Sequence, residues 1–214
     1  MNVTPRRKPH QSAKARGRKP SQKSVATRQL ILDGAAALFA ERGYGLTTLA
    51  DIAESIGIHL TGLYYYYDNK EQLACDIIAS NAENIRSALE EAIDLLPKNA
   101  GALSRLSVAI DTYLNCIHEP ANLARAAAKI TSQLSEDARG PALEGTRENN
   151  SLWLELIEQA IAEGTIRSDV DPKMIQMSLL GSMNWSVEWF DSNKGPTAPL
   201  AKTIKAAFLE GLGT

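Results

Sequence analysis

Apolar residues recur at intervals of three and four along the chain, from about residue 29 to the C-terminus. This spacing is typical of one face of an α-helix, and the period-two alternation of a strand is absent. In the first such stretch Ile31, Leu32, Ala35, Leu38 and Phe39 share one helix face. The pattern predicts an all-α protein of about nine helices, three short helices followed by six longer ones.

Gly, Pro and polar clusters separate these stretches and predict where the helices end. The first helix should end at Gly43. We expect the others near residues 47–56, 58–66, 69–95, 102–117, 121–134, 142–163, 172–191 and 198–211. Residues 1–23 contain Pro, Gly, Ser, Lys and Arg without apolar periodicity, which predicts a flexible arm before the first helix.

The second and third expected helices are short and meet at Gly57, a residue that permits a tight turn. The first of the two has an apolar face that includes Leu49, Ile52 and the small Ala53. This arrangement is typical of a helix-turn-helix, whose second helix enters the major groove of DNA. The sequence therefore predicts a DNA-binding domain over residues 24–72 and a larger helical domain over 73–214.

Side chains at the start of the second motif helix, and at the N-termini of the helices that flank it, are the expected DNA contacts. They are Thr47, Thr48, His59, Leu60, Thr61, Gly62, Tyr64, Tyr66 and Lys70. His and Thr can hydrogen-bond base edges, Leu can contact a thymine methyl, and Tyr, Lys and helix N-termini can bind phosphates. Ile58 and Leu63 should face the core. The run of four tyrosines also fits buried aromatics, and Tyr67 is the one that we expect inside.

The formal net charge of −2 conceals a strong asymmetry. Residues 1–28 contain nine basic residues and no acid, whereas residues 29–72 contain two basic and six acidic residues. We expect Arg16, Arg18 and Lys19 to contact phosphates or an adjacent minor groove, because the motif itself is acidic. The alternative is a tail that only keeps the protein in solution.

Several short motifs between Arg28 and Leu73 occur in a specific order: Ala-Ala-x-Leu-Phe, Glu-Arg-Gly-Tyr, Thr-Thr-Leu-x-Asp-Ile-Ala, Leu-Tyr-Tyr-Tyr and Asn-Lys-Glu-x-Leu. This stretch resembles the DNA-binding domain of TetR-family transcriptional regulators. The sequence departs from the usual family pattern at Leu60, Thr61-Gly62 and Tyr67. These departures affect base contacts, so the resemblance does not indicate which operator is bound.

The resemblance implies that the remaining helices bind a ligand and form a homodimer. Residues 172–191 are apolar on more than one face, which favours a core on one side and a second subunit on the other. The expected interface residues are Gly181, Trp185, Trp189, Ile204 and Phe208. A fully buried helix of a monomer is the alternative.

The run Leu-Leu-Gly-Ser-Met-Asn-Trp within residues 172–191 also resembles a motif of TetR regulators of fatty-acid and steroid breakdown. Some of those regulators respond to acyl-CoA thioesters. The resemblance implies an apolar or acyl-CoA-type effector, with Tyr113, Trp153 and Asn184 as candidate pocket residues. Each of the three fits a packing role equally well. The implied function is a ligand-responsive regulator, in most such cases a repressor, that binds a palindromic operator as a dimer. Ligand binding would tilt the helix at 69–95 and so change the spacing of the two recognition helices.

An enzyme is the first competing class. His10, His59 and His118 are not spaced for a metal site, and neither Gly-x-Ser-x-Gly nor a glycine-rich phosphate loop occurs. Cys75 and Cys116 lack Cys-x-x-Cys spacing. We expect both to be reduced, partly buried thiols of a cytoplasmic protein. We therefore expect no catalytic residues, no metal and no cofactor.

A helical adaptor that binds an anionic membrane or nucleic acid through the basic arm is the second competing class. The arm lacks the large apolar residues that a membrane-lying helix needs, and no run reaches the length of a membrane span. The sequence favours DNA, without a membrane partner.

Overall fold

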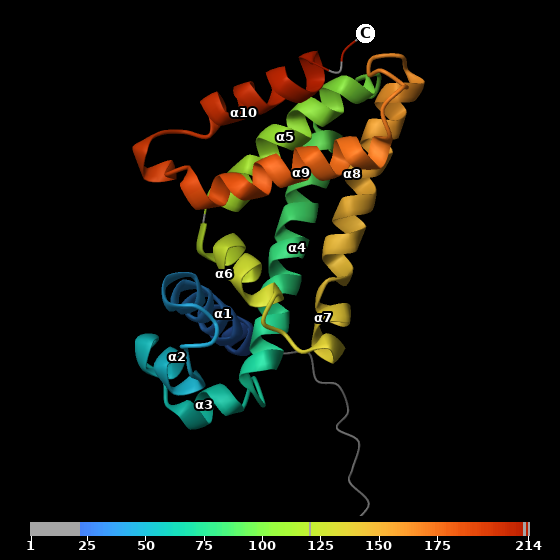
Figure 1. The fold of residues 1–214 in the computed structure, drawn as a ribbon. Coiled ribbons are helices and arrows are strands. Elements are labelled where there is room, and N and C mark those ends of the chain that lie inside the picture. Colours follow the sequence, from blue (N-terminus) through green and yellow to red (C-terminus); the bar gives the residue numbers. More distant parts are fainter. Residues whose placement is uncertain (1–21, 120, 212, 214) are drawn as a thin grey trace, which may run out of the picture.

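The computed structural model describes residues 22–119, 121–211 and 213. Within these residues the chain forms ten α-helices and no strand, apart from an isolated bridge between Ile166 and Gly213 (Figure 1). The helices are α1 (Gln22–Arg42), α2 (Leu49–Ser55), α3 (Leu60–Tyr64), α4 (Lys70–Asp94), α5 (Ala102–His118), α6 (Ala121–Thr131), α7 (Glu136–Ala142), α8 (Glu144–Ala162), α9 (Pro172–Trp189) and α10 (Ala198–Lys205). A 3₁₀ turn at Ser192–Lys194 and a π turn at Ala206–Glu210 flank α10. The all-α prediction is confirmed.

Local capping explains the boundaries of the short helices. Thr48 is the N-cap of α2, because its hydroxyl accepts from the Asp51 amide while the Asp51 carboxylate accepts from the Thr48 amide. Asn69 is the N-cap of α4, and its side-chain oxygen accepts from the Gln72 amide. Gly43 follows the end of α1, and Gly57 lies in the turn after α2. Their φ angles are 88° and 69°, values that glycine adopts without strain.

The prediction of a break at Gly140-Pro141 was wrong, because α7 continues through both residues. The Ser135 hydroxyl accepts from the Ala138 amide, and Glu136 and Asp137 lie in the first turn, where acidic residues favour a helix. Proline removes one backbone donor, but α7 ends at Ala142, one residue beyond Pro141, so little helix is lost. The chain turns at Leu143 and α8 begins at Glu144.

Two apolar cores organise the helices. The lower core in Figure 1 joins α1, α2, α3 and the first half of α4 to α6 and α7, and α1 lies directly against α6. The upper core joins the second half of α4 to α5, α8, α9 and α10. Helix α4 is common to both cores, and α6 packs against α1 although it lies far beyond residue 72 in the sequence.

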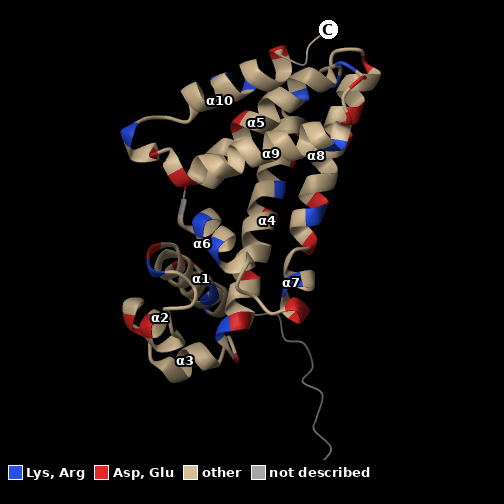
Figure 2. Ribbon diagram, viewed as in Figure 1, with Lys and Arg blue, Asp and Glu red and all other residues tan. Residues whose placement is uncertain are grey.

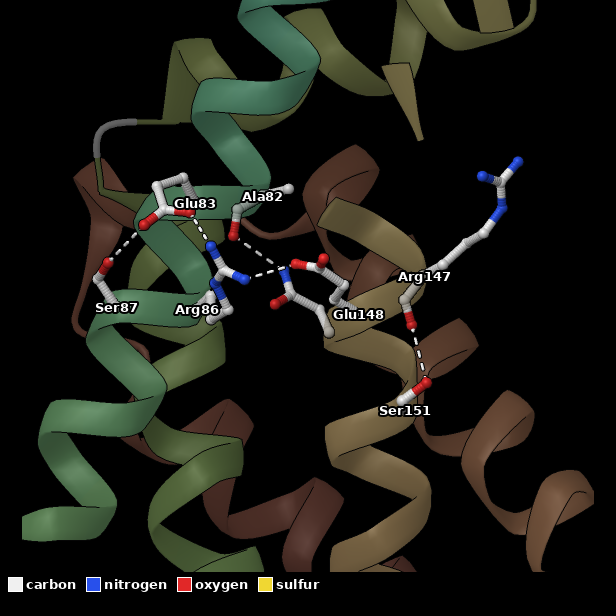
Figure 3. Close-up of polar contacts among 8 residues, drawn as sticks. Ala82, Glu83, Arg86, Ser87, Arg147, Glu148 and Ser151 are labelled. Atoms are coloured by element: carbon white, nitrogen blue, oxygen red, sulfur yellow. Dashed lines mark hydrogen bonds and ion pairs between the residues drawn. The ribbon is translucent and has the colours of Figure 1, made fainter. Parts of the chain in front are cut away.

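Polar contacts attach α8 to the middle of α4 (Figure 3). The Arg86 guanidinium bonds Glu83 on its own helix and Glu148 on α8. The Asn149 amide donates to the Ala82 carbonyl over 2.9 Å, and a Cβ on Gly145 would lie 3.0 Å from the Ala82 Cβ. Because Gly145 allows this close approach, we call the contacts of Ala82 and Arg86 with α8 the α4–α8 clamp.

Candidate nucleic-acid interface and effector cavity

Helix α3 presents its first turn to solvent at the lower end of the molecule (Figure 1). His59, Leu60, Thr61, Gly62 and Tyr64 are all exposed, whereas Leu63 on the other face is fully buried. A Cβ built on Gly62 would meet no atom within 4 Å. The structure therefore brings five of the expected DNA contacts onto one open helix face, which has the position of a recognition helix.

The four tyrosines at the end of α3 and just after it differ in exposure. Tyr67 is buried, as predicted, and its burial raises the pKa of its hydroxyl. Tyr64 is exposed, but Tyr65, 82% exposed, takes the outward position expected of Tyr66. Tyr66 is half-buried and packs edge-on against Tyr65, with ring centroids 5.2 Å apart. The expectation that Tyr66 points outward was wrong, because the helix ends at Tyr64 and the helical phase of later residues changes.

Thr47 cannot contact a phosphate through its side chain, and this expected contact is corrected. The residue is fully buried, and its hydroxyl donates to the Gly43 carbonyl over 2.9 Å. The neighbouring Thr48 is exposed, and its hydroxyl donates to the Asp51 carboxylate over 2.7 Å. These bonds hold the pKa of Asp51 below its usual value.

Lys70 holds the connection between α1 and α2. Its ammonium donates to the backbone carbonyls of Tyr44, over 2.8 Å, and Thr47, over 2.9 Å. The same ammonium lies 4.2 Å from the centroid of the Tyr44 ring, a cation–π contact. Lys70 is half-buried, and these contacts of its ammonium position the start of the helix-turn-helix. A phosphate contact from its remaining proton stays a prediction.

The helix-turn-helix itself carries no positive charge on α2 or α3. Figure 2 shows acidic residues on α2, which are Asp51 and Glu54, and α3 has neither Lys nor Arg. Attraction to a polyanion must therefore come from other parts of the chain. The expected phosphate-binding residues Arg16, Arg18 and Lys19 lie outside the described residues.

A cavity of about 380 Å³ lies between α4, α5, α6, α8 and α9, at the junction of the two cores. Two of the three expected pocket residues, Tyr113 and Asn184, line it, and the Tyr113 hydroxyl donates to the Asn184 side-chain oxygen over 2.7 Å. Burial raises the pKa of Tyr113 to about 12, so the phenol is neutral at physiological pH. Both residues have the position and polarity to orient a ligand.

Trp153 does not line the cavity, and the expectation of a direct ligand contact is corrected. The indole is buried behind Tyr113 and packs edge-on against it, with centroids 5.7 Å apart. Its size and periodicity placed it correctly in the core but did not indicate which layer it occupies. Trp153 supports the Tyr113 ring from behind.

Sequence reasoning missed the contribution of α6 to the cavity. Ala124, Ala127, Ala128 and Thr131 recur at helical spacing and form the α6 wall. Alanine runs are common in helices because of their high helix propensity, so the composition alone gave no sign of a pocket. Sequence reasoning also missed Glu188, which lines the cavity. Apart from the neutral Tyr113 phenol, Glu188 is the only ionisable side chain in the described lining.

Helix α9 has two apolar faces, as its sequence pattern predicts. One face is buried in the upper core, and the other exposes Met174, Met177, Trp185 and Trp189, the two indoles by 67% and 59%. Gly181 lies in the same exposed stripe. We call these residues the α9 stripe. Ile204 is only 7% exposed inside the upper core and so cannot add appreciably to an interface, contrary to expectation, while Phe208 is half-buried.

Two further findings concern the described residues. None of their helices is long and apolar enough to cross a membrane. Their His, Cys, Asp and Glu side chains form no group of three or more that could hold a metal ion.

A helix-turn-helix joined to a larger helical unit with a cavity beside their junction is the architecture of a DNA-binding regulator with a sensor domain. Residues 31–76 match the family model described as "Bacterial regulatory proteins, tetR family", and residues 99–212 match "Tetracyclin repressor-like, C-terminal domain". The chain belongs to the TetR family of transcriptional regulators.

Individual relatives agree with this assignment. The chain is 27% identical over 190 residues to the HTH-type transcriptional repressor KstR2 of Rhodococcus jostii (strain RHA1), which covers 86% of this chain and 90% of the relative. The solved structure of ketosteroid transcriptional regulator KstR2 of Mycobacterium tuberculosis has a TM-score of 0.76 at 24% identity, covering 88% and 95%. The structure of AibR in complex with isovaleryl coenzyme A and operator DNA has a TM-score of 0.74 at 22% identity, covering 85% and 97%. At these identities the two structures establish the shared fold.

Proposed function

We propose that this protein is a cytoplasmic, ligand-responsive transcriptional repressor that binds a palindromic operator as a homodimer. The observation that carries the proposal is the cavity at the junction between the core of the helix-turn-helix and the core of the sensor domain. A ligand bound there touches α4 and α6, and both helices pack directly against α1 of the DNA-binding unit. The relatives named as repressors support the sign of the regulation.

On the DNA side, α3 supplies the base contacts. His59 and Thr61 offer hydrogen bonds, Leu60 offers an apolar contact, and Gly62 lets the backbone approach the DNA closely. Tyr64, Thr48 and Lys70 face the phosphates on either side. Arg16, Arg18 and Lys19 supply the positive charge that α2 and α3 lack.

On the ligand side, the cavity favours a neutral group over an anion. Its described lining contains no Lys, Arg or His, and its one charged residue is the carboxylate Glu188. A free carboxylate would therefore lose its hydration without gaining a cation, whereas a neutral thioester or ketone could accept a hydrogen bond from the Asn184 amide. These features support an apolar acyl-CoA-type effector, with the acyl part inside and the coenzyme A phosphates outside the cavity.

The α9 stripe supplies the dimer contact. Large apolar side chains and Gly181 occupy the exposed face of α9, and burying them against a second copy would remove two indoles from water. A palindromic site requires that the two-fold axis place the two α3 helices on the same side of the dimer.

The proposal is tested by selecting genomic DNA fragments with the purified full-length protein at about 0.15 M salt, a concentration at which nonspecific binding is weakened. We expect enrichment of a palindrome, and loss of that enrichment in the His59→Ala/Thr61→Ala variant. The matched control is Lys173→Met, at an exposed residue far from α3. Binding to anionic lipid vesicles without enrichment of any DNA site would support the adaptor alternative and overturn the proposal.

A further inference from the structure

Helix α6 lies between the cavity and the first helix of the DNA-binding unit. Its cavity face is formed by Ala124, Ala127, Ala128 and Thr131. On another side of the same helix, Ala126 and Ile130 are fully buried in the lower core, against α1. Figure 1 shows α6 beside α1 and below α9. A group that fills the cavity therefore presses on α6 directly.

Helix α8 forms another part of the cavity wall through Thr146, and the α4–α8 clamp joins it to α4 (Figure 3). Helix α6 has 11 residues and packs against both α1 and α4, with Ala126 and Ile130 fully buried. Because α6 packs closely against α1, a ligand that displaces α6 also moves the surface on which α1 rests.

The end of α6 is attached to the chain segment that leads into the helix-turn-helix. The Lys129 ammonium donates to the Ala40 carbonyl over 2.6 Å, in the last turn of α1. This carbonyl lies at the negative end of the helix dipole, where a cation is favoured. A second contact lies beyond it, because a Cβ on Gly45 would be only 3.3 Å from the Gln133 side-chain oxygen.

Lys70 holds the connection between α1 and α2 from the side of α4, through the carbonyls of Tyr44 and Thr47. One lysine from α6 therefore holds the last turn of α1, and one lysine from α4 holds the connection that follows it. Lys70 is half-buried on the shared helix α4, whereas Lys129 is exposed on α6, the helix that contributes most residues to the cavity lining.

We infer that Lys129 is the positioning residue that transmits occupancy of the cavity to the helix-turn-helix, by carrying a displacement of α6 to the C-terminal turn of α1. This inference rests on the proposed function. It differs from a pure tilt of α4, in which contacts between α6 and α1 would not be needed for the response.

The test uses a substitution in place of the ligand. Thr146→Phe fills part of the cavity from α8. Affinity for the selected DNA site is measured for the wild type, Thr146→Phe, Lys129→Met and the double variant. The control pair combines Thr146→Phe with Lys98→Met, at an exposed lysine, and Lys129→Arg tests whether charge at this position is sufficient. Sedimentation and far-UV circular dichroism establish that each variant is a folded dimer.

We expect Thr146→Phe to weaken DNA binding at least about 5-fold, within the usual range of allosteric coupling. The same substitution should change affinity less than about 2-fold in the Lys129→Met background and should keep its full effect with Lys98→Met or Lys129→Arg. Equal fold-changes in the Lys129→Met and Lys98→Met backgrounds would overturn the inference. No effect of Thr146→Phe on the wild type would overturn it as well.

Hydrogen exchange measures the mobility of the connection between α1 and α2 and does not require DNA. Amides between Ala40 and Thr48 should exchange severalfold differently in Thr146→Phe than in the wild type, and this difference should vanish with Lys129→Met. If the wild type selects no DNA site, the proposed function fails, while this exchange comparison still decides the role of Lys129. If DNA is selected and the exchange difference persists without Lys129, only the present inference fails.

Discussion

The hydroxyl of Tyr113 donates a 2.7 Å hydrogen bond to the side-chain oxygen of Asn184, and this bond joins α5 to α9 at the wall of the cavity. Tyr113 is held from behind by Trp153, whereas Asn184 is exposed. The bond leaves both protons of the Asn184 amide free to donate to a ligand carbonyl. It therefore positions the main hydrogen-bond donor that the cavity offers.

Replacing Tyr113 with Phe removes the donor but keeps the ring against Trp153. Because water can reach the freed Asn184 oxygen, we expect a loss of only about 1 kcal/mol in the free energy of unfolding. Urea denaturation measures this loss. Trp153→Ala is the contrasting variant, and it should cost about 3–5 kcal/mol because it leaves a large cavity in the core. Equal losses for the two variants would contradict the assigned positions.

The raised pKa of Tyr113, about 12, predicts a specific loss of stability in alkaline solution. The unfolded chain releases the phenolic proton near pH 10, whereas the folded protein keeps it to about pH 12, so the stabilising contribution is complete below pH 10 and is lost between about pH 10 and 12. The free energy of unfolding of the wild type should fall more steeply over this window than that of Tyr113→Phe. Identical slopes would show that this phenol is not shielded in the folded state.

Lys70→Met should weaken DNA binding without any change in the residues that face the DNA bases. The substitution leaves the carbonyls of Tyr44 and Thr47 without their donor, which frees the connection between α1 and α2. We expect a stability loss of about 1–3 kcal/mol and a lower affinity for every DNA sequence tested. Calorimetry and fluorescence anisotropy measure the two effects. Lys173→Met, at a lysine that is exposed on α9, should change neither.

Two threonines of the DNA-binding unit, the buried Thr47 and the exposed Thr61 of α3, should respond in opposite ways to substitution by valine. Thr47→Val removes a buried hydroxyl that bonds the Gly43 carbonyl, so it should lower stability and leave sequence preference intact. Thr61→Val changes an exposed residue on the α3 face, so it should leave stability intact and relax preference at one base pair of each half-site. Thermal unfolding and binding to single-base variants of the site distinguish the two cases.

Trp185→Glu should convert the dimer to a monomer, because it places a charge in the centre of the α9 stripe. Sedimentation velocity at micromolar concentration measures the change. Tyr65→Glu is the control, since it changes an exposed aromatic residue at the opposite end of the molecule. A dimer that survives Trp185→Glu would place the subunit contact elsewhere.

The helix pattern and the helix-turn-helix were predictable because they depend on local signals. Each of these signals depends on only a few consecutive residues: the apolar spacing, the Thr48 cap and the glycines at 43 and 57. The recognition face followed from the same local pattern, because Leu63 must be buried and its neighbours on the other side of a short helix must then be exposed.

The errors arose where contacts between distant segments decide the outcome. Periodicity marks Trp153 and Ile204 as apolar positions, but only packing shows that one lies behind Tyr113 and the other inside the upper core. The role of α6 was hidden for the same reason, because Ala127 and Lys129 acquire their neighbours from α1 and α4, about 50 to 90 residues earlier in the chain. Helix α7 was missed because Gly140-Pro141 is a strong local break signal that the Ser135 cap outweighs.

Footprinting the selected DNA site with hydroxyl radicals tests the central claim most directly. A dimer with one α3 face per subunit should protect two half-sites on the same face of the duplex, with centres about 34 Å or one helical turn apart. The protection should disappear in the His59→Ala/Thr61→Ala variant. A single protected stretch, or protection that does not depend on His59 and Thr61, would contradict the account.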